Sequence, residues 1–417
     1  MLEKCQKWGA FVKVLWIGVG IGPKLHQQLL DSGGKILSAQ ISESNLIQGL
    51  DAQKLSLDTL NAPNIDCRLI PKICEERWSR QGGSADYSVG YRNIEYLNRL
   101  LKQRALCKAA RQWAAIYRRE SKILVFVYSM HTPFIAAAWI IKKYLPQAEI
   151  CLVVPDLPQY MDMNMNPIKK VFKAIDWKRI CRYRMCVDKY VLYAKPMADF
   201  LKLKADQWTV MEGSYDSNYL ADESNSNRPA MSKVSAMYSG VLDQRYGIPE
   251  LLDAMDLLDD GYELWLTGSG NAEELIRERA ARDSRIKFFG YLPSRQDLLD
   301  KQAQATMLIS PRRDTEEASK YCFPSKLFEY MASVRPVISC FLAGIPDEYH
   351  AYLIELPSAT SQEIAKALEK VAQMTEVEQA EFGLAAKNFV LSKKNKLAQA
   401  KRILDFVLNK EGETRSN

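Results

Sequence analysis

Short, almost wholly apolar runs alternate with stretches of helical periodicity along most of this chain. In the first half the runs span residues 12–17, 123–128, 150–154, 189–194 and 208–212, and in the second half 235–239, 263–267, 286–289, 306–310, 336–340 and 352–356. A strand that is apolar on both sides needs a sheet covered on both faces, and strands that alternate with helices form parallel sheets. The sequence therefore predicts an α/β protein with doubly wound parallel sheets.

The chain is long for a single hydrophobic core, and its 417 residues suit two domains of roughly 100 to 200 residues each. The polar segment 223–232, which contains Pro229, separates the two series of strands and predicts a linker. We therefore expect a first Rossmann-like domain over residues 1–222 and a second over 233–387. The polar end of the chain, 410–417, is expected to be a disordered tail.

The formal net charge is +7, and the excess of basic residues lies entirely in residues 1–222. Such an excess favours an anionic partner: nucleic acid, a phosphorylated substrate or an anionic membrane surface. The sequence has no zinc-finger, RNP-type or helix-turn-helix signature, so we expect no nucleic-acid partner. The nine cysteines include no C-x-x-C pair, and no apolar run approaches the ~20 residues of a membrane span. We therefore expect a cytoplasmic protein in a reducing compartment.

A glycine-rich loop, Gly18-Val19-Gly20-Ile21-Gly22-Pro23, follows the first apolar run. Dinucleotide-binding folds begin with the same strand, loop and helix, but their glycine spacing is G-x-G-x-x-G. In addition, no acidic residue ends the next strand-like run, 35–41. We therefore expect no nicotinamide or other cofactor.

Two polar clusters follow strands of the first half, one around His131 and one around Asp156. In open α/β sheets ligands bind at the carboxyl ends of the strands, so both residues are candidates for a functional site. Structural roles are the alternative, because His131 could cap the next helix and Asp156 could simply terminate its strand. A long helical pattern over 91–120 precedes the strand that leads to His131.

The stretch Cys322-Phe323-Pro324-Ser325-Lys326-Leu327-Phe328-Glu329-Tyr330-Met331-Ala332 predicts a helix that begins shortly after a strand. Pro324 has a φ that suits a helix start, and Ser325 can cap the first turn with its hydroxyl. Lys326 and the free N–H groups of the helix start predict a phosphate site. Leu327 falls on the inward face, while Glu329 lies one turn in, within reach of hydroxyl groups.

Three further loops of the second half follow strands and contain glycine. In the loop 240–247 the planar fork of Arg245 suits a diphosphate, although a solvated surface arginine is the alternative. The loops 266–271 and 288–293 allow a ligand to approach the backbone. The positions that we expect to contact substrate in these loops are Gly240, Arg245, Gly268, Gly270, Tyr291 and Leu292.

The motif FPSKLFEYMAS, followed by RPVIS, resembles the signature of bacterial glycosyltransferases of family 4, which have the GT-B fold. The resemblance implies two Rossmann-like domains that face a cleft, with a helix over 388–408 that crosses back to the first domain. It implies that Glu329 holds ribose hydroxyls, that the loop of Tyr291 and Leu292 lies against the base, and that the loop of Asp156 lies beside the transferred sugar. The implied catalytic residues are Asp156, His131, Arg245 and Lys326, and further substrate-binding positions are Gly20, Gly22, Ser325 and Leu327.

The sequence departs from the family pattern at three positions. Tyr321 stands where the family has a glutamate that contacts the sugar, and Tyr246 stands where it usually has lysine. Val334 replaces the usual glycine after the helix, which costs roughly 1 kcal/mol if the left-handed backbone is kept. Acidic residues that could take the place of the missing glutamate lie just upstream: Asp314, Glu316 and Glu317.

The resemblance implies a retaining transfer of a sugar from a nucleotide-diphospho-sugar to a saccharide acceptor, expected to be lipid-linked, in cell-surface polysaccharide synthesis. The leaving diphosphate would help to deprotonate the acceptor, so no protein nucleophile is expected. The sequence has no D-x-D triplet, and we expect no metal. A sugar-nucleotide epimerase of the same fold and a non-catalytic partner subunit remain as alternatives.

A basic, amphipathic helix is predicted over residues 168–186. Its apolar residues lie near one face, and its seven lysines and arginines outnumber the single acid Asp176. This pattern is typical of a helix that lies in a membrane interface, so we expect the protein to be peripheral on the inner face of the cell membrane. A crossover helix packed on the core, with a solvated basic face, is the alternative.

Overall fold

The computed structural model describes residues 12–35, 37–80, 84–160, 167–216, 233–312 and 317–408. They form two compact units. Unit 1 comprises the chain up to residue 193, residues 197–214 and the chain from 396 onward, and unit 2 comprises residues 194–196 and 215–395. The linker expected at 223–232 and the tail expected at 410–417 lie outside the described residues.

Unit 1 is built on an eight-stranded sheet of order β10-β9-β8-β7-β1-β2-β5-β4, in which only β4 runs antiparallel to its neighbour. Its strands are β1 (Lys13–Gly18), β2 (Ser56–Asn61), β4 (Glu76–Trp78), β5 (Asp86–Ser88), β7 (Ile123–Tyr128), β8 (Glu149–Val154), β9 (Lys189–Leu192) and β10 (Trp208–Val210), and a separate antiparallel pair is β3 (Lys72–Ile73) and β6 (Tyr91–Arg92). Its helices are α1 (Pro23–Asp31), α2 (Ser38–Asp51), α3 (Asn98–Ile116), α4 (Thr132–Tyr144), α5 (Pro167–Tyr183), α6 (Pro196–Leu201) and α13 (Lys396–Val407).

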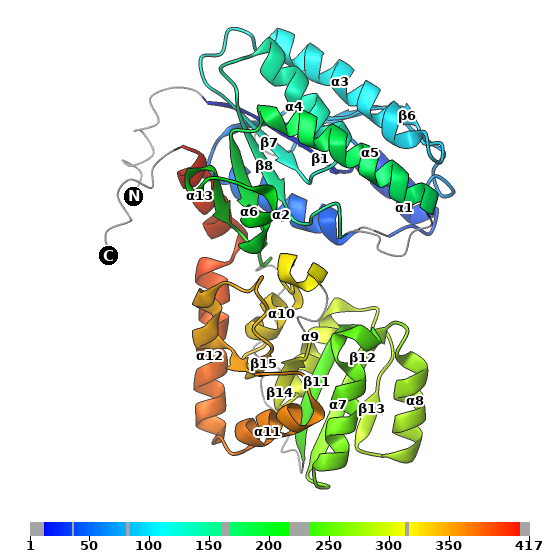
Figure 1. The fold of residues 1–417 in the computed structure, drawn as a ribbon, viewed down its shortest axis with the longest axis vertical. Helices are drawn as coiled ribbons and strands as arrows, with labels where there is room; N and C mark the ends of the chain where they lie inside the picture. The colour runs from blue at the N-terminus through cyan, green and yellow to red at the C-terminus, as the bar shows by residue number, and fades with distance from the viewer. Residues whose placement is uncertain are drawn as a thin grey trace. The chain divides into compact units, whose positions relative to one another are not determined.

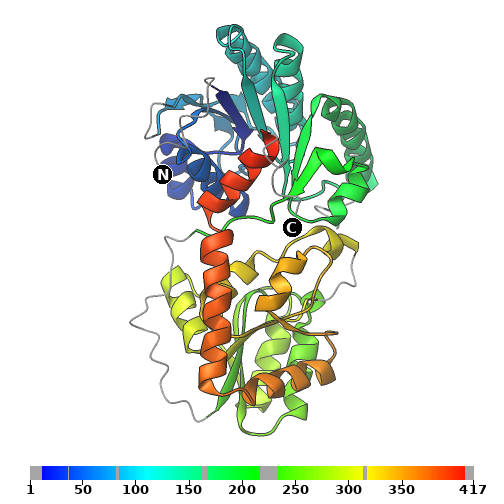
Figure 2. The ribbon, with the colours of Figure 1, turned by 90° about the vertical axis from the view of Figure 1, so that its left-hand side faces the viewer.

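The direction of winding in unit 1 reverses between β1 and β7, which are paired neighbours. Right-handed crossovers on either side of such a point place their helices on opposite faces. Accordingly α3, α4 and α5 pack together on one face, and α2 and α13 pack together on the other (Figures 1 and 2). Every residue of β1 and β7 is buried, as expected for strands covered on both sides.

Three features of unit 1 differ from the sequence predictions. The run 35–41 is not a strand, because α2 begins at Ser38. The helical pattern over 91–120 begins instead with β6, and α3 starts only at Asn98. The strand β2, which pairs with β1 in parallel register, had no prediction.

Unit 2 is built on a six-stranded, wholly parallel sheet of order β13-β12-β11-β14-β15-β16. Its strands are β11 (Val234–Val241), β12 (Tyr262–Ser269), β13 (Ile286–Phe288), β14 (Met307–Ser310), β15 (Val337–Ser339) and β16 (Ile354–Glu355), and its helices are α7 (Ile248–Ala254), α8 (Glu273–Arg282), α9 (Arg295–Gln304), α10 (Lys326–Ala332), α11 (Ser361–Ala372) and α12 (Glu376–Lys393). All six strands lie where the apolar runs predicted them. The two sheets confirm the predicted α/β, doubly wound fold class.

The winding of unit 2 reverses between β11 and β14. The helices α7 and α11 pack against each other, and α10 packs against α12, so both faces of the sheet are covered (Figures 1 and 2). The core between these layers is apolar and includes Met237, Leu266, Leu308 and Ile338, each of which is fully buried. The strands that flank the point of reversal are therefore held in a buried, well-packed core.

The helix predicted over 388–408 is two helices, because α12 ends at Lys393 and α13 begins at Lys396. The residues between them pair with another part of the chain. The N–H of Tyr215 donates to the carbonyl of Lys394 at 2.7 Å, and Tyr215 forms a parallel bridge with Asn395. The Lys394 side chain is buried, and its Nζ lies 2.6 Å from the Glu348 carboxylate. These contacts fix the position at which the helix is interrupted.

Candidate functional site

The carboxyl ends of β11 and β14 meet at the point where the winding of unit 2 reverses, which is where open α/β sheets bind ligands. The chain places Gly240 and the loop 240–247 at the end of β11 and Arg312 just beyond the end of β14. The next helix, α10, begins with Lys326. We call the residues Gly240, Tyr246, Arg312, Lys326 and Glu329 the switch-point site.

Lys326 lies over the ring of Tyr238, with Nζ 3.9 Å from the ring centroid. Gly240 has φ +132°, and a Cβ placed on it would lie 3.1 Å from the same Nζ. Burial and, to a smaller extent, the nearby charge of Arg312 lower the pKa of Lys326 to about 7, while the charge of Glu329 acts in the opposite direction. Within the described ranges the ammonium makes no ion pair. Lys326 is therefore a half-buried amine whose charge the described residues offset only in part, through Glu329, which suits a phosphate site.

The glycines of the neighbouring loop have a packing role. A Cβ on Gly268 would lie 1.8 Å from the carbonyl oxygen of Gly240, its partner in the β11–β12 register. A Cβ on Gly270 would lie 2.2 Å from the carbonyl oxygen of Leu242. Both glycines therefore permit close contact between two backbone segments, whereas only Gly240 of these three lies against a candidate binding group.

Arg245 differs from the expectation that its fork is free for a diphosphate. Its Nε and Nη2 lie 3.0 and 2.8 Å from the two carboxylate oxygens of Asp243. The hydrogen bond from Arg245 is the main reason that the pKa of Asp243 is lowered to about 2. The positive charge of Arg245 is therefore already matched by a carboxylate two residues away.

Arg312 is a candidate binding residue that the sequence analysis did not identify. Its Cζ lies 4.6 Å from the ring centroid of Tyr246. Its Nε is enclosed and has no hydrogen-bond partner among the described residues. It makes no ion pair with the carboxylates that the structure describes. The signal that could have found it is its place two residues after β14, at the binding edge of the sheet.

Glu329 lies in the first turn of α10, where its Oε1 is 3.0 Å from Nη2 of Arg295. Arg295 is the first residue of α9, which Ser294 caps by accepting a hydrogen bond from the N–H of Asp297. Both members of the Glu329–Arg295 pair remain about one-third exposed, at 30% and 34%. The carboxylate is therefore held in place and can still reach a ligand.

The first turn of α10 is hydrogen-bonded in a different way from the one predicted. Ser325 precedes the helix, but it has helical dihedral angles and its hydroxyl makes no capping bond. Instead the N–H of Leu327 donates to the carbonyl of Pro324 at 2.9 Å, and the N–H of Phe328 to that of Ser325 at 3.2 Å. The Leu327 side chain is fully buried in the core. The capping role of Ser325 was thus wrong, and its hydroxyl stays exposed beside Lys326.

The loop after β13 presents an exposed ring. Gly290 has φ +65°, and its carbonyl accepts hydrogen bonds from Gly268 N–H at 2.9 Å and from Thr267 Oγ1 at 2.6 Å. These bonds fix the loop, while Tyr291 is exposed and Leu292 is half-buried. The exposed Tyr291 ring presents an aromatic surface of the kind on which planar groups stack.

Two departures from the family pattern can be placed. Val334 has φ +62°, so the predicted left-handed backbone after α10 is kept with a β-branched side chain. Tyr321 ends a short 3-10 helix over Glu317–Tyr321. Asp314 and Glu316, which could replace the missing glutamate, lie outside the described residues.

In unit 1 the two predicted residues follow β7 and β8. His131 occupies the N-cap position of α4 but makes no capping bond. Burial, together with the charges of Lys102 and Arg99, lowers the pKa of His131 to about 4, so the ring is neutral near pH 7. Desolvation raises the pKa of Asp156, although its side chain reaches solvent.

The glycine loop of unit 1 is held by carboxyl groups. The N–H of Val19 lies 3.0 Å from both carboxyl oxygens of Glu43. The Glu76 carboxylate accepts hydrogen bonds from the N–H of Lys24 at 2.9 Å and of Leu25 at 3.3 Å. A Cβ on Gly22 would lie 2.3 Å from Oε2 of Glu76.

The start of α1 therefore already carries an anion. Gly20 and Gly22, which the family resemblance implies as substrate-binding positions, therefore lie beside a helix start that a carboxylate of the chain already occupies. Gly20 lies against a second strand of the same unit, because a Cβ on it would be 2.5 Å from Oδ1 of Asn61, the last residue of β2.

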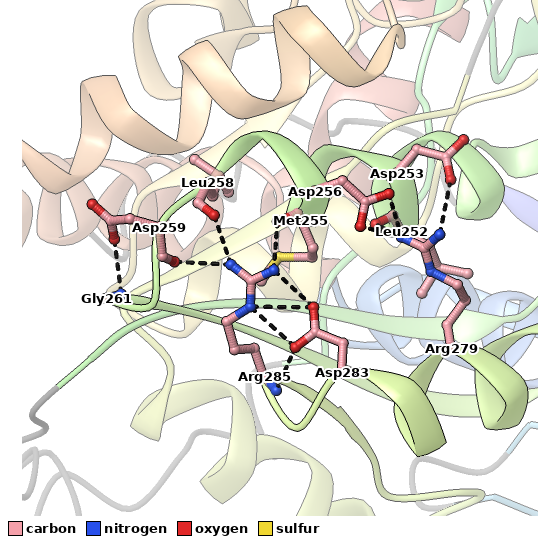
Figure 3. Close-up of polar contacts among 10 residues, drawn as sticks. All are labelled: Leu252, Asp253, Met255, Asp256, Leu258, Asp259, Gly261, Arg279, Asp283 and Arg285. Atoms are coloured by element: carbon pink, nitrogen blue, oxygen red, sulfur yellow. Dashed lines mark hydrogen bonds and ion pairs between the residues drawn. The ribbon is translucent and has the colours of Figure 1, made fainter.

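A polar cavity of about 720 Å³ lies at the opposite edge of the unit 2 sheet, beside the beginnings of β11 and β13. Two of its arginines, Arg279 and Arg285, are paired with acidic residues (Figure 3). Arg285 donates to the carbonyls of Met255, Leu258 and Asp259 and pairs with Asp283 at 2.8 Å. These contacts connect the residue before β13 to the segment that follows α7.

Within the described ranges no group of three or more His, Cys, Asp or Glu side chains is arranged to hold a metal ion. No described helix is long and apolar enough to cross a membrane.

Residues 233–374 match a family model described as "Glycosyl transferases group 1". The chain is similar in structure to a sucrose-phosphate synthase from Thermosynechococcus elongatus (TM-score 0.63, 15% identity, 95% of this chain and 98% of that chain). It is also similar to Anabaena HepE in complex with UDP (TM-score 0.63, 13% identity, 95% and 100%) and to an α,α-trehalose 6-phosphate synthase from Burkholderia multivorans (TM-score 0.61, 11% identity, 95% and 98%). The sequence has no significant match among curated proteins.

At these identities the likeness shows the fold, which is the GT-B fold with two Rossmann-like domains. The family match covers most of unit 2 and includes all of the switch-point site. Together they support a glycosyltransferase of the GT-B fold.

Proposed function

We propose that the chain is a retaining glycosyltransferase of family 4 that uses a nucleotide-diphospho-sugar as donor. The observation that carries the proposal is the position of Lys326, whose half-buried amine lies against Gly240 at the reversal point of the unit 2 sheet, with Glu329 one turn further along α10. A lysine suits the diphosphate, and a carboxylate offers acceptors for the two ribose hydroxyls. Anabaena HepE, a structural neighbour, was crystallised with UDP.

In this proposal the protein acts by positioning and electrostatics. Lys326 stabilises the negative charge that develops on the leaving diphosphate. Glu329, held by Arg295, orients the ribose, and the exposed ring of Tyr291 stacks on the base. The diphosphate itself takes the proton of the acceptor hydroxyl, so the mechanism needs no protein nucleophile and, in the absence of a D-x-D triplet, no metal.

We further propose a lipid-linked saccharide acceptor and attachment to the inner face of the cell membrane. The support comes from α5, where Val171, Phe172 and Ile175 are 60%, 62% and 51% exposed. A crossover helix packed on the core would bury these residues, whereas among the described members of the predicted apolar set only Ile180 is fully buried. Exposed lysine and arginine side chains on the same helix suit an anionic surface: Lys170, Lys178 and Arg182.

The test is incubation of the purified protein with radiolabelled UDP-, GDP- and dTDP-sugars in the presence of a bacterial lipid extract. The expected result is transfer of label to the lipid fraction with retention of the anomeric configuration. Conversion of the donor to its epimer without transfer would favour an epimerase. Donor binding without turnover would favour a non-catalytic partner subunit, which the replacement of the usual glutamate by Tyr321 makes a specific alternative.

A further inference from the structure

The loop 240–247 and the end of β14 are in direct contact in unit 2. Gly247 has φ +82°, and a Cβ placed on it would lie 2.5 Å from the carbonyl oxygen of Pro311. Tyr246 comes just before Gly247, and Arg312 comes just after Pro311. The contact therefore places Tyr246 against Arg312. The guanidinium carbon of Arg312 lies 4.6 Å from the Tyr246 ring centroid, at cation–π distance.

The charge of Arg312 at this contact is not matched by a described carboxylate. Arg312 makes no ion pair with any carboxylate in the part of the chain that the structure describes. It is also close enough to Lys326 to lower the pKa of that amine. Arg245, by contrast, is held in a two-bond fork by Asp243. Two like charges that face each other in a partly desolvated place are stabilised by an anion bound between them.

We propose that Arg312 is the second cation that binds the donor diphosphate, beside Lys326, and that Tyr246 is the positioning residue that holds it. This assignment rests on the proposed function. The ring of Tyr246 occupies the position at which the family resemblance leads one to expect a lysine, and the stacked guanidinium of Arg312 supplies the positive charge there. Arg245, the cation expected from the sequence, has the smaller role because its charge is already matched.

The experiment is a calorimetric titration of the full chain with UDP, GDP and dTDP. The diphosphate that binds most tightly is then compared with its own nucleoside. Arg312→Gln is expected to weaken binding of that diphosphate at least tenfold and to leave the affinity for the nucleoside unchanged. Arg245→Gln is expected to cause the smaller loss. Arg277→Gln is the control, because Arg277 also lies 4.7 Å from an aromatic ring, that of Phe288, and is exposed away from the switch-point site.

The positioning role of Tyr246 has its own pair of variants. Tyr246→Phe keeps the ring and is expected to bind the diphosphate as the unsubstituted protein does. Tyr246→Leu removes the ring and is expected to reproduce most of the Arg312→Gln loss, with little further effect when the two are combined. The double variant Tyr246→Lys with Arg312→Gln moves the positive charge from position 312 to position 246. It is expected to bind the diphosphate more tightly than Arg312→Gln alone. Far-UV circular dichroism checks that each variant folds.

The possible outcomes distinguish failure of the Arg312 assignment from failure of the proposed function. If the unsubstituted chain binds a nucleoside diphosphate and Arg312→Gln binds it equally well, the assignment of Arg312 is overturned and the proposed function stands. A larger loss for Arg245→Gln than for Arg312→Gln overturns the assignment as well. If the unsubstituted chain binds none of the three diphosphates, the proposed function fails, and the assignment fails with it.

Discussion

The Glu329 carboxylate lies 3.0 Å from the guanidinium of Arg295, and about one-third of each side chain remains exposed. An ion pair in such contact with water contributes little to stability, so substitutions of Glu329 report on binding. Glu329→Ala is expected to weaken nucleoside diphosphate binding at least tenfold, because two hydrogen bonds to the ribose, worth ~1.5 to 3 kcal/mol each, are lost. Tyr321→Phe is expected to change the affinity much less. Equal affinities of Glu329→Ala and the unsubstituted protein in calorimetry with UDP would contradict the assigned role.

Donor binding is expected to depend on pH through Lys326. Burial lowers the pKa of this amine to about 7, so it is about half charged in the free protein at neutral pH. A bound diphosphate favours the charged form and raises the pKa. Affinity is therefore expected to fall as pH rises above 7, by up to about tenfold per pH unit, and binding at pH 8 takes up a proton. Calorimetry in two buffers of different ionisation enthalpy measures this uptake, which Lys326→Arg should abolish.

The stability of the chain is expected to depend on pH through Glu43. Burial raises the pKa of this carboxyl to about 8, against 4.5 for the free side chain. Between these values the folded chain binds a proton that the unfolded chain has lost, so the free energy of unfolding falls as pH rises, by up to about 1.4 kcal/mol per unit. Glu43→Gln should flatten this slope between pH 5 and 8 in urea titrations. A slope unchanged by the substitution would show that another group is responsible.

The left-handed backbone at Val334 predicts a stabilising substitution. A β-branched residue at φ +62° is strained, and glycine adopts this conformation freely. Val334→Gly is expected to raise the free energy of unfolding by about 1 kcal/mol or less, because the gain is partly offset by the greater entropy of the unfolded chain. Lys202→Gly, at φ +54° without a branched Cβ, should give a smaller gain. Destabilisation by Val334→Gly would contradict the assignment of strain.

Membrane attachment is expected to depend on both the apolar and the basic residues of α5. The protein should sediment with anionic liposomes at low salt, less at high salt, and not with neutral liposomes. Phe172→Glu should abolish sedimentation, and so should joint replacement of Lys169, Lys170 and Lys173 by glutamate. Val377→Glu is the control, because Val377 is equally exposed on α12. Equal sedimentation with both kinds of liposome would count against the proposal.

The strands that the sequence did not predict have physical reasons for being hidden. The strand β2 contains Asp58, which is buried because it pairs with Lys13 at 2.7 Å and accepts a hydrogen bond from Trp113 at 2.9 Å. A strand that buries a charge matched elsewhere in the chain does not appear as an apolar run. Conversely, the false strand at 35–41 owed its pattern to Leu37 and Ile41, which are exposed. The central strands of unit 2, β11, β12, β14 and β15, were predictable because their apolar runs are buried on both faces.

The candidate site was predictable where it depends on local spacing. Lys326 and Glu329 lie three residues apart at the start of one helix, so the sequence alone places them together. Arg312 depends on the contact between Gly247 and Pro311, which lie 64 residues apart in the numbering and have no local signal. The pairing of Arg245 with Asp243, only two residues away, was within reach of the sequence and was missed.

The carboxylate of Glu76 at the start of α1 affects how the ligand preference of the glycine loop, residues 18–23, can change by substitution. The glycine loop follows β1, whereas Glu76, which accepts hydrogen bonds from the start of α1, lies on β4, about fifty residues further along the chain. Glu76 can therefore be replaced while the sequence of the loop is kept. Replacement of Glu76 by a small neutral residue would leave the N–H groups of Lys24 and Leu25 vacant and the backbone unchanged. A single substitution in β4 would then convert a closed helix end into an open receptor for a foreign anion, and the ligand preference of the loop would be set by a residue outside it.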